Sequence, residues 1–471
     1  MVSNREPYRP RMEDGATGWK RTTGGLVSAL EPLVRRRNGT WIAWSPGAER
    51  RIVRSRVPGD GASFAMLQVP LSSDEVERYY EGFANGALWP LFHSFVDRCR
   101  FECDHWEEYR RINERFADVL VEEADDEALV WIHDYHFCLL PRLARERGCS
   151  APIAYFCHIP FPAPEIFQLL PWRRAVLAGL LGADLIGFHC ISYARHFVAS
   201  CRQFLGADVS LDGGTVVFEG RRSRVVAAPI GIEVQEFESL SRDPAVVARS
   251  LEIRERLGAE KVILGVDRLD YTKGIAARLQ AIDELFERHP EHRRRVTFVQ
   301  VAVRSRSRIP EYQETKQRVD ELVGRINGGY GDAEWQPIRY SNDGLEREEL
   351  VAYYLACDVC LVTPLRDGMN LVALEFCACR TQEDGVLVLS EFAGASELLD
   401  GAALTVNPYA VHEMAEALHQ SIVMPHAEQE RRMRRARRRV TKHDVHHWVE
   451  EILSAVPRRR RRLVEQGMSV G

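Results

Sequence analysis

The chain has 471 residues, a length that predicts about two or three domains. Of these residues 45% are hydrophobic and 28% are charged, which is enough apolar material for packed cores. A formal net charge of −5 argues against a nucleic-acid partner held by a basic field. The longest apolar stretch, residues 175–190, contains Asp184 and is shorter than the ~20 residues of a membrane span, so we expect no membrane partner. Eleven cysteines without regular spacing, and no signal-peptide pattern, predict a cytoplasmic protein with reduced thiols.

Short β-branched apolar runs alternate with longer amphipathic stretches along most of the chain. Near-continuous apolar runs are typical of parallel strands that helices cover on both faces. The predicted strands lie within residues 128–134, 151–160, 183–189, 223–232, 260–270, 294–303, 358–365 and 385–394. Residues 274–289 have apolar positions at three- and four-residue spacing, which predicts a helix. The alternation predicts βαβ units and open parallel sheets.

The pattern has a predicted seam near residue 235. We expect an α/β protein with two Rossmann-like, doubly wound parallel-sheet domains facing a cleft, over residues 1–235 and 236–445. Residues 446–471 are expected to form a C-terminal helix that packs back on the first domain, followed by a basic tail. The arginine-rich segment from residue 428 is interpreted as a solvated helix face, with binding of an anionic partner as the alternative.

Residues that follow predicted strands are candidates for function, because open parallel sheets bind ligands beyond the carboxyl ends of their strands. Asp134 and His158 follow neighbouring predicted strands, and a proline-rich turn after His158 presents that side chain rigidly. The predicted strand that begins near residue 260 ends at Val266, and Arg268 and Lys273 follow it on a loop. Two cations at a strand end suit a diphosphate, with surface charge beside a neighbouring carboxylate as the alternative.

Two predicted helix beginnings are candidates for phosphate binding, because a helix N-terminus offers unpaired N–H groups and a positive dipole end. In "VTPLRDGMNLVALEF", Asp367 could accept hydrogen bonds from sugar hydroxyls, and Glu375, two helical turns on, could chelate a ribose diol. The alternatives are helix capping by Asp367 and a solvated Glu375. Gly24 and Gly25 precede a second apolar-periodic segment, where an ordinary turn is the alternative.

Other motifs do not complete the metal or hydrolase sites that they resemble. His133 and His136 form an HxxH without a third carboxylate ligand, which is typical of packing. Cys357 and Cys360 form a CxxC with no second pair. The segment "HEMAEALH" at residues 412–419 is not an HExxH motif, because Glu416 stands in the place of the second histidine. The chain also lacks a G-x-S-x-G elbow, a P-loop and a strand–G-x-G-x-x-G–helix.

Eleven motifs occur in order along residues 2–456: "VSNRE", "TTGGL", "YYEGFANGALWPLFH", "WIHDYH", "HIPFPAPEIF", "PIGIE", "DRLDYTKG", "RINGGYG", "TPLRDGMNLVALEF", "LVLSEFAGASEL" and "HHW". They resemble the trehalose-6-phosphate synthases, retaining glycosyltransferases of family 20 with the GT-B fold. The resemblance implies glucosyl transfer from a nucleoside-diphosphate glucose to glucose 6-phosphate, giving α,α-trehalose 6-phosphate. It implies no metal and no cofactor beyond this co-substrate.

The resemblance also implies a role for each residue that matches a family motif. The implied catalytic residues are Asp134, His158, Arg268, Lys273 and Asp367. The implied donor-binding residues are Gly24, Gly25, His158, Arg268, Lys273, Leu345, Asp367, Gly368, Met369, Asn370, Leu371, Val372 and Glu375. The implied acceptor-binding residues are Arg5, Trp44, Tyr80, Trp89, Asp134 and Arg306.

The chain departs from the family pattern at three places. Only Met1 precedes "VSNRE", where the family usually has several apolar residues that complete the first strand, and a short first strand would place Arg5 less firmly. Leu374 stands where the family usually has a lysine, and "AVRSRSR" lets Arg304 or Arg308 share the role of Arg306. Two other activities stay open: transfer to glycerol 3-phosphate, and a catalytically silent sugar-phosphate sensor. The sequence does not choose among uridine, guanosine and adenosine as the donor base, and it leaves the oligomeric state open, a homo-oligomer included.

Overall fold

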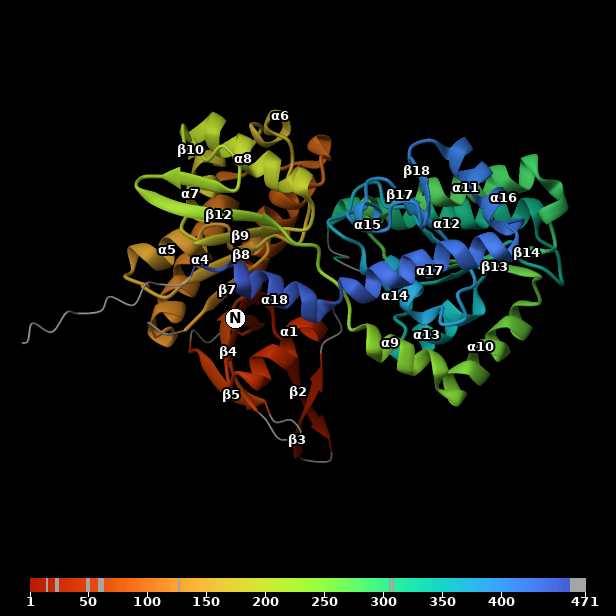
Figure 1. Cartoon of the computed structure of the whole chain (residues 1–471), viewed down its shortest axis with the longest axis horizontal. Coiled ribbons are helices and arrows are strands. Elements are labelled where there is room, and N and C mark those ends of the chain that lie inside the picture. Colours follow the sequence, from red (N-terminus) through yellow and green to blue (C-terminus); the bar gives the residue numbers. More distant parts are fainter. Residues whose placement is uncertain are drawn as a thin grey trace, which may run out of the picture.

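Two mainly parallel sheets, each accompanied by helices, organise the chain (Figure 1). The computed structural model describes residues 1–13, 16–21, 25–47, 51–57, 63–125, 128–304, 306 and 309–457. The first half of the chain forms a ten-stranded sheet and the second half a six-stranded sheet. Within the described ranges, no helix combines the length and the apolar character needed to cross a membrane.

The ten-stranded sheet is parallel from β12 to β6 and antiparallel at its edges. Its spatial order is β10 (Asp208–Val209), β11 (Thr215–Phe218), β12 (Arg221–Ala227), β9 (Leu185–Phe188), β8 (Ile153–Phe156), β7 (Val130–His133), β1 (Val2–Arg5), β4 (Thr40–Pro46), β6 (Phe64–Leu71) and β5 (Val53–Val57). The strand order reverses between β7 and β1. A reversal of this kind leaves a crevice at the carboxyl ends of the two strands where ligands bind in open α/β sheets.

All pairings in the six-stranded sheet are parallel. Its order is β15 (Ile338–Ser341), β14 (Val296–Val303), β13 (Lys261–Arg268), β16 (Val359–Val362), β17 (Val386–Ser390) and β18 (Leu404–Val406). Here the order reverses between β13 and β16, so the segments after these two strands share the second switch point. A separate antiparallel hairpin joins β2 (Tyr8–Glu13) to β3 (Ala16–Arg21).

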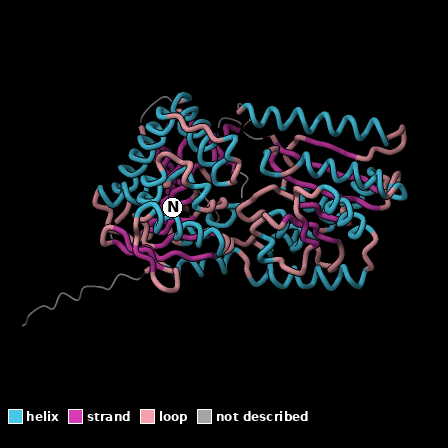
Figure 2. Tube along the Cα trace, turned by 90° about the horizontal axis from the view of Figure 1, so that it is seen from above, coloured by secondary structure: helices cyan, strands magenta, loops and turns pink. Residues whose placement is uncertain are grey.

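Helices lie on both faces of the strands, as the view in Figure 2 shows. Those of the first half are α1 (Gly25–Arg36), α2 (Ser73–Glu75), η1 (Val76–Leu88), α3 (Trp89–Phe92), η2 (Val96–Arg98), α4 (Cys103–Glu123), η3 (Tyr135–Phe137), α5 (Leu140–Glu146), α6 (Pro164–Phe167), α7 (Arg173–Leu180) and α8 (Ile191–Leu205). Those of the second half are α9 (Val234–Arg242), α10 (Pro244–Leu257), η4 (Tyr271–Lys273), α11 (Ile275–Arg288), η5 (Pro290–His292), α12 (Pro310–Tyr330), α13 (Arg347–Ala356), α14 (Leu371–Cys379), α15 (Ala395–Leu398), α16 (Val411–Ile422), α17 (His426–Lys442) and α18 (Val445–Ala455).

The last helix, α18, returns to the ten-stranded sheet (Figure 1). Trp448 is fully buried, and its ring centroid lies 5.2 Å from that of Trp131 in β7 and 5.1 Å from that of Phe156 in β8. Arg224 of β12 also donates a hydrogen bond to the carbonyl of Ala455. Apolar packing therefore holds α18 against the first sheet.

All eight predicted strands are present, as β7, β8, β9, β12, β13, β14, β16 and β17, and the helix predicted in residues 274–289 is α11. The sequence did not predict η1, a π-helix of thirteen residues. Within it, a Cβ on Gly82 would lie 2.6 Å from the His105 ring, so a glycine is required for this close approach. π-Helices are rare and often occur at functional sites, and η1 carries Tyr80 and leads directly into Trp89. The domain boundary near residue 235 stays a prediction.

Candidate active site

Asp134 and His158 lie side by side, because the strands that they follow, β7 and β8, are neighbours in the sheet. The Asp134 N–H donates to the Phe156 carbonyl at 2.8 Å, and the Asp134 carboxylate accepts from the His158 N–H at 3.2 Å. Asp134 has a φ of +75°, which non-glycine residues rarely adopt. This strain is held in place by the surrounding hydrogen bonds and directs the carboxyl group to the strand end.

Burial sets the protonation of both side chains. It raises the pKa of Asp134 to about 6, although backbone hydrogen bonds and the charges of Arg306 and Arg268 favour the ionised form. Burial, with His133 and His189 nearby, holds the pKa of His158 well below its usual range. At neutral pH, Asp134 is therefore mostly ionised and His158 is a neutral imidazole.

Lys273 and Asp367 form an ion pair across the second switch point. Lys273 Nζ lies 2.5 Å from Asp367 Oδ2, and the Asp367 carboxylate also accepts from the Gly368 N–H and the Asn370 side-chain amide. Burial alone would raise the pKa of Asp367, but Lys273 outweighs it and lowers this pKa. The helix-capping alternative for Asp367 is wrong, since Asn370 occupies the N-cap of α14 and makes no side-chain capping bond.

Arg268 is half-exposed at the end of β13. Its guanidinium is 4.0 Å from Asp270, while the neighbouring Asp267 is engaged by the fully buried Arg278 at 2.5 Å. Arg268 therefore keeps an accessible positive charge near the buried Asp270. Of the two carboxylates that the alternative allows as partners, Arg268 is paired with Asp270 and not with Asp267, and anion binding by Arg268 stays a prediction.

Glu375 is partly buried on α14 and accepts a hydrogen bond from Tyr354 at 2.8 Å, so the interpretation as a solvated side chain is wrong. Burial raises its pKa. Leu345, Leu371 and Val372 are partly exposed and pack against one apolar core. Leu374 is fully buried in that core, so this position faces inward and accommodates an apolar residue.

A cluster of aromatic rings and guanidinium groups lies beside Asp134. Arg5 donates to the Tyr80 hydroxyl at 3.1 Å, and the Tyr80 and Trp44 ring centroids are 6.3 Å apart. The Arg306 guanidinium stands 4.0 Å above the Trp89 ring, in the range of a cation–π interaction. Burial alone would raise the pKa of Tyr80, but Arg306 and Arg5 outweigh it and lower this pKa to about 8.

Several hydrogen bonds hold the Arg306 side chain in place. Its side chain is 5% exposed and donates to the hydroxyls of Tyr135 and Tyr312 and to Asp270. Its buried Nε has no hydrogen-bond partner among the described residues, and neither does the indole N–H of Trp89. The sequence analysis missed Tyr135, Tyr312 and Asp270 as supports. Two of them could have been found from their positions in the sequence, since Tyr135 adjoins Asp134 and Asp270 lies between Arg268 and Lys273.

Residues predicted to bind the donor lie next to residues predicted to bind the acceptor, between the six-stranded and the ten-stranded sheet. The Arg268 and Arg306 guanidiniums both lie over the Trp89 ring, at 5.5 Å and 4.0 Å. A Cβ on Gly368 would lie 2.1 Å from the His158 carbonyl oxygen, so the loop before α14 touches the loop after β8. The structure thus brings the predicted donor and acceptor residues into one place.

Some predicted residues are not placed at this junction. Gly24 lies outside the described residues, as does Arg308, and Gly25 is the first residue of α1. Arg304 is exposed. In the described part of the chain, the sets of three side chains that could hold a metal contain none of the predicted site residues, the two histidines of the HxxH or the CxxC cysteines.

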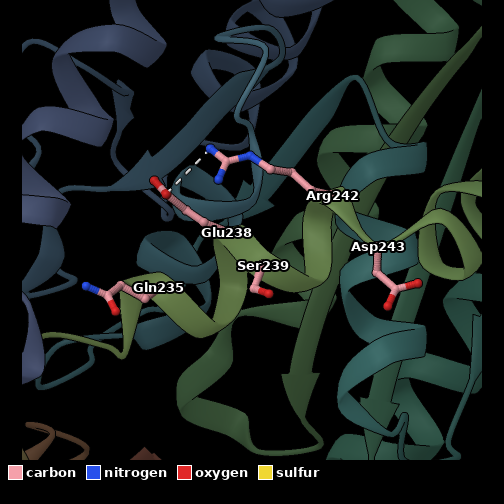
Figure 3. A pocket seen from close by; sticks show the side chains of 5 residues that line it. All are labelled: Gln235, Glu238, Ser239, Arg242 and Asp243. Carbon is pink, nitrogen blue, oxygen red and sulfur yellow. Dashed lines mark ion pairs between the residues drawn. The ribbon is translucent and has the colours of Figure 1, made fainter.

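Figure 3 shows a polar pocket on α9, next to the predicted seam. Gln235, Glu238, Ser239, Arg242 and Asp243 line it. Glu238 faces Arg242 across 3.6 Å and also pairs with Arg437 of α17, so its charge is matched locally. The lining contains no predicted site residue, and we assign this pocket no role.

The two mainly parallel α/β sheets match those of the solved trehalose-6-phosphate synthases, which places the chain among glycosyltransferases of the GT-B fold. The family model for glycosyltransferase family 20 matches residues 1–458. The trehalose-6-phosphate synthase of Mycobacterium avium is 42% identical over 465 residues, covering 97% of this chain and 94% of that protein. The chain therefore belongs to glycosyltransferase family 20, and its resemblance to trehalose-6-phosphate synthases is confirmed.

Two solved structures show the same architecture. The Escherichia coli trehalose-6-phosphate enzyme bound to UDP-2-fluoro glucose has a TM-score of 0.89 at 33% identity, covering 97% of this chain and 99% of that one. A Burkholderia xenovorans UDP-forming α,α-trehalose-phosphate synthase in complex with glucose-6-phosphate has a TM-score of 0.87 at 32% identity, covering 96% of this chain and 98% of that one.

Proposed function

We propose that this chain transfers glucose from a nucleoside-diphosphate glucose to glucose 6-phosphate and forms α,α-trehalose 6-phosphate. The observation that carries the proposal is the shared position of Arg268 and Arg306 over Trp89. Two anionic substrates that react with each other need two cationic subsites in contact, and these guanidiniums provide them. The names of the relatives, the sugar nucleotide in one matched structure and the glucose 6-phosphate in another agree with this assignment.

We assign the donor to the switch point of the six-stranded sheet. Arg268, Lys273 and the backbone N–H groups from Gly368 to Val372 would hold the diphosphate and the transferred glucose, with the Gly25 backbone as a further contact. Glu375 would chelate the ribose, and Leu345 would lie near the base. Charge neutralisation by Arg268, Lys273 and the α14 N-terminus would stabilise the leaving diphosphate, so we expect no metal requirement.

We assign the acceptor to the switch point of the ten-stranded sheet. Arg5, Tyr80 and Arg306 would bind the phosphate of glucose 6-phosphate, because two guanidiniums and a phenol converge there. Trp44 and Trp89 would shape the sugar pocket. Cation–π stacking on Trp89 would keep the Arg306 guanidinium in place beside the ligand.

We propose a same-face reaction that retains the anomeric configuration. The bond between the donor anomeric carbon and the diphosphate oxygen breaks while the acceptor hydroxyl attacks from the same side. The hydroxyl proton passes to the departing phosphate oxygen. Asp134 would orient the acceptor, and the neutral His158 would donate to the transferred sugar. A glycosyl adduct trapped on Asp134 or Asp367 would overturn this route.

The direct test pairs each donor with each acceptor. Purified protein is incubated with UDP-, GDP- or ADP-glucose and with glucose 6-phosphate or glycerol 3-phosphate, and products are followed by mass spectrometry. We expect a disaccharide phosphate with glucose 6-phosphate, and the active donor then identifies the base. Product with glycerol 3-phosphate alone, or no product with any pair, contradicts the proposal.

A further inference from the structure

Three histidines and two glutamates converge where η5 follows α11 and where α16 lies beside α11 (Figure 1). They are His289, Glu291, His292, Glu416 and His419. We propose that this corner binds one divalent transition-metal ion of the zinc type, with His289, Glu291 and His419 as ligands. The site is separate from the proposed active site and shares no residue with it.

The three proposed ligands already have the spacing of a coordination shell. One ligand atom from each of His289, Glu291 and His419 lies within 4.8 Å of the other two. His289 Nδ1 is 3.4 Å from Glu291 Oε1, and the imidazoles of His289 and His419 stack with centroids 3.8 Å apart and planes 8° apart. Tetrahedral zinc with bonds of about 2.1 Å separates its ligand atoms by roughly 3.4 Å. A metal–imidazole bond lies in the plane of the ring, so one of the two stacked rings must turn out of the stack for both histidines to bind one ion.

The remaining ring nitrogens have the partners that metal-bound histidines use. His289 Nε2 is 3.4 Å from Glu416 Oε1, and Glu416 is itself held by Arg288 at 3.1 Å. His419 Nδ1 is 2.9 Å from His292 Nε2. Such outer hydrogen bonds fix the orientation and tautomer of a metal-bound imidazole. They leave His289 Nδ1 and His419 Nε2 to face the metal.

Three side-chain ligands leave one position of a tetrahedral shell open, and on binding water would complete the shell.

The proposed site includes residues of the segment "HEMAEALH", which does not match an HExxH motif. Glu416 and His419 lie on one face of α16 and meet His289 from another element. His412 of the same segment pairs instead with Glu284 at 2.8 Å. A competing set in the described residues, Glu102, Asp104 and His105, has one imidazole and two exposed carboxylates.

The test titrates zinc chloride alone into the metal-free full chain by isothermal titration calorimetry. The variants are His289→Ala and His419→Ala, with His105→Ala as the matched control from the competing set. We expect one zinc ion per wild-type chain, a loss of affinity of at least about tenfold in the first two variants, and unchanged binding in the control. Circular dichroism checks that each variant is folded.

Cobalt spectroscopy of the wild-type protein tests the ligand type without any substitution. Co²⁺ in the proposed site should give the d–d bands of a nitrogen and oxygen shell, without thiolate-to-cobalt charge transfer. Thiolate charge transfer, absence of zinc binding by the wild type, or loss of binding in His105→Ala alone would each overturn the proposal. These readouts measure binding, so they do not depend on the transferase activity.

Discussion

The contact between Gly368 and His158 makes Gly368→Ala the sharpest steric test of the active-site geometry. A Cβ at Gly368 would lie 2.1 Å from the His158 carbonyl oxygen, whereas ordinary contacts begin at 3.4 Å, so the loops must separate by about 1.3 Å. The backbone of Gly368 is not left-handed, so the cost is steric rather than conformational. A misplacement of ~1 Å can cost ~100-fold in rate. We therefore expect kcat/KM to fall about 100-fold, which corresponds to about 2.7 kcal/mol.

The assay is release of nucleoside diphosphate with the active donor and glucose 6-phosphate. Gly324→Ala is the matched control, because its Cβ would meet nothing within 4 Å on α12. This control should keep its kinetic constants and gain about 0.5–1 kcal/mol in stability, as alanine replaces glycine in a helix. A folded Gly368→Ala protein with kcat/KM within threefold of wild type would refute the close-contact reasoning.

Three further predictions follow from charge and burial. Arg268→Ala should lower kcat/KM by about 10²–10³-fold, because the leaving diphosphate is stabilised less. The control Arg295→Ala, which removes an exposed arginine, should leave kcat/KM unchanged. Equal activity in the two variants would contradict the donor assignment. Absorbance titration should find one tyrosine with a pKa of about 8. This ionisation should be absent in Tyr80→Phe, and its pKa should be higher in Arg5→Ala, which removes a neighbouring positive charge. The same titration curve in both variants and the wild type would contradict the described cluster. The raised pKa of Asp134 lowers the stability as pH rises from about 3.8, where the unfolded chain ionises, to about 6, where the folded protein does, and the loss is complete above that. Asp134→Asn should therefore raise stability at pH 7 by up to about 3 kcal/mol, with little change near pH 3.5, as thermal unfolding would measure; equal gains at both pH values would rule out this cause.

The sequence predicted best the elements whose residues are buried on both faces. Strands such as β13 and β16 appear as continuous apolar runs because helices cover both sides of the sheet. The antiparallel edge strand β5 has mostly exposed residues and no such signal. The π-helix η1 contains two glycines, and Gly82 lies against the His105 ring of α4, a contact between two elements that local sequence does not show.

The candidate site was predictable where a strand end carries a charge. Asp134, His158 and Arg268 follow strands that the apolar runs define, so their convergence could be expected from parallel topology. Arg306 lies in an irregular arginine-rich segment, where only the family resemblance singled it out. The metal-site histidines belong to two separate helical segments, and no local spacing relates His289 to His419.

The most direct measurement is the anomeric configuration of the product, read by NMR from glucose 6-phosphate and donor glucose that are both labelled at C1 with ¹³C. The account predicts one disaccharide phosphate whose two anomeric carbons are both α-configured and joined through a single oxygen. A β-linked product would contradict the same-face reaction, and free glucose released by hydrolysis as the only labelled product would contradict transfer between two substrates held together at Trp89.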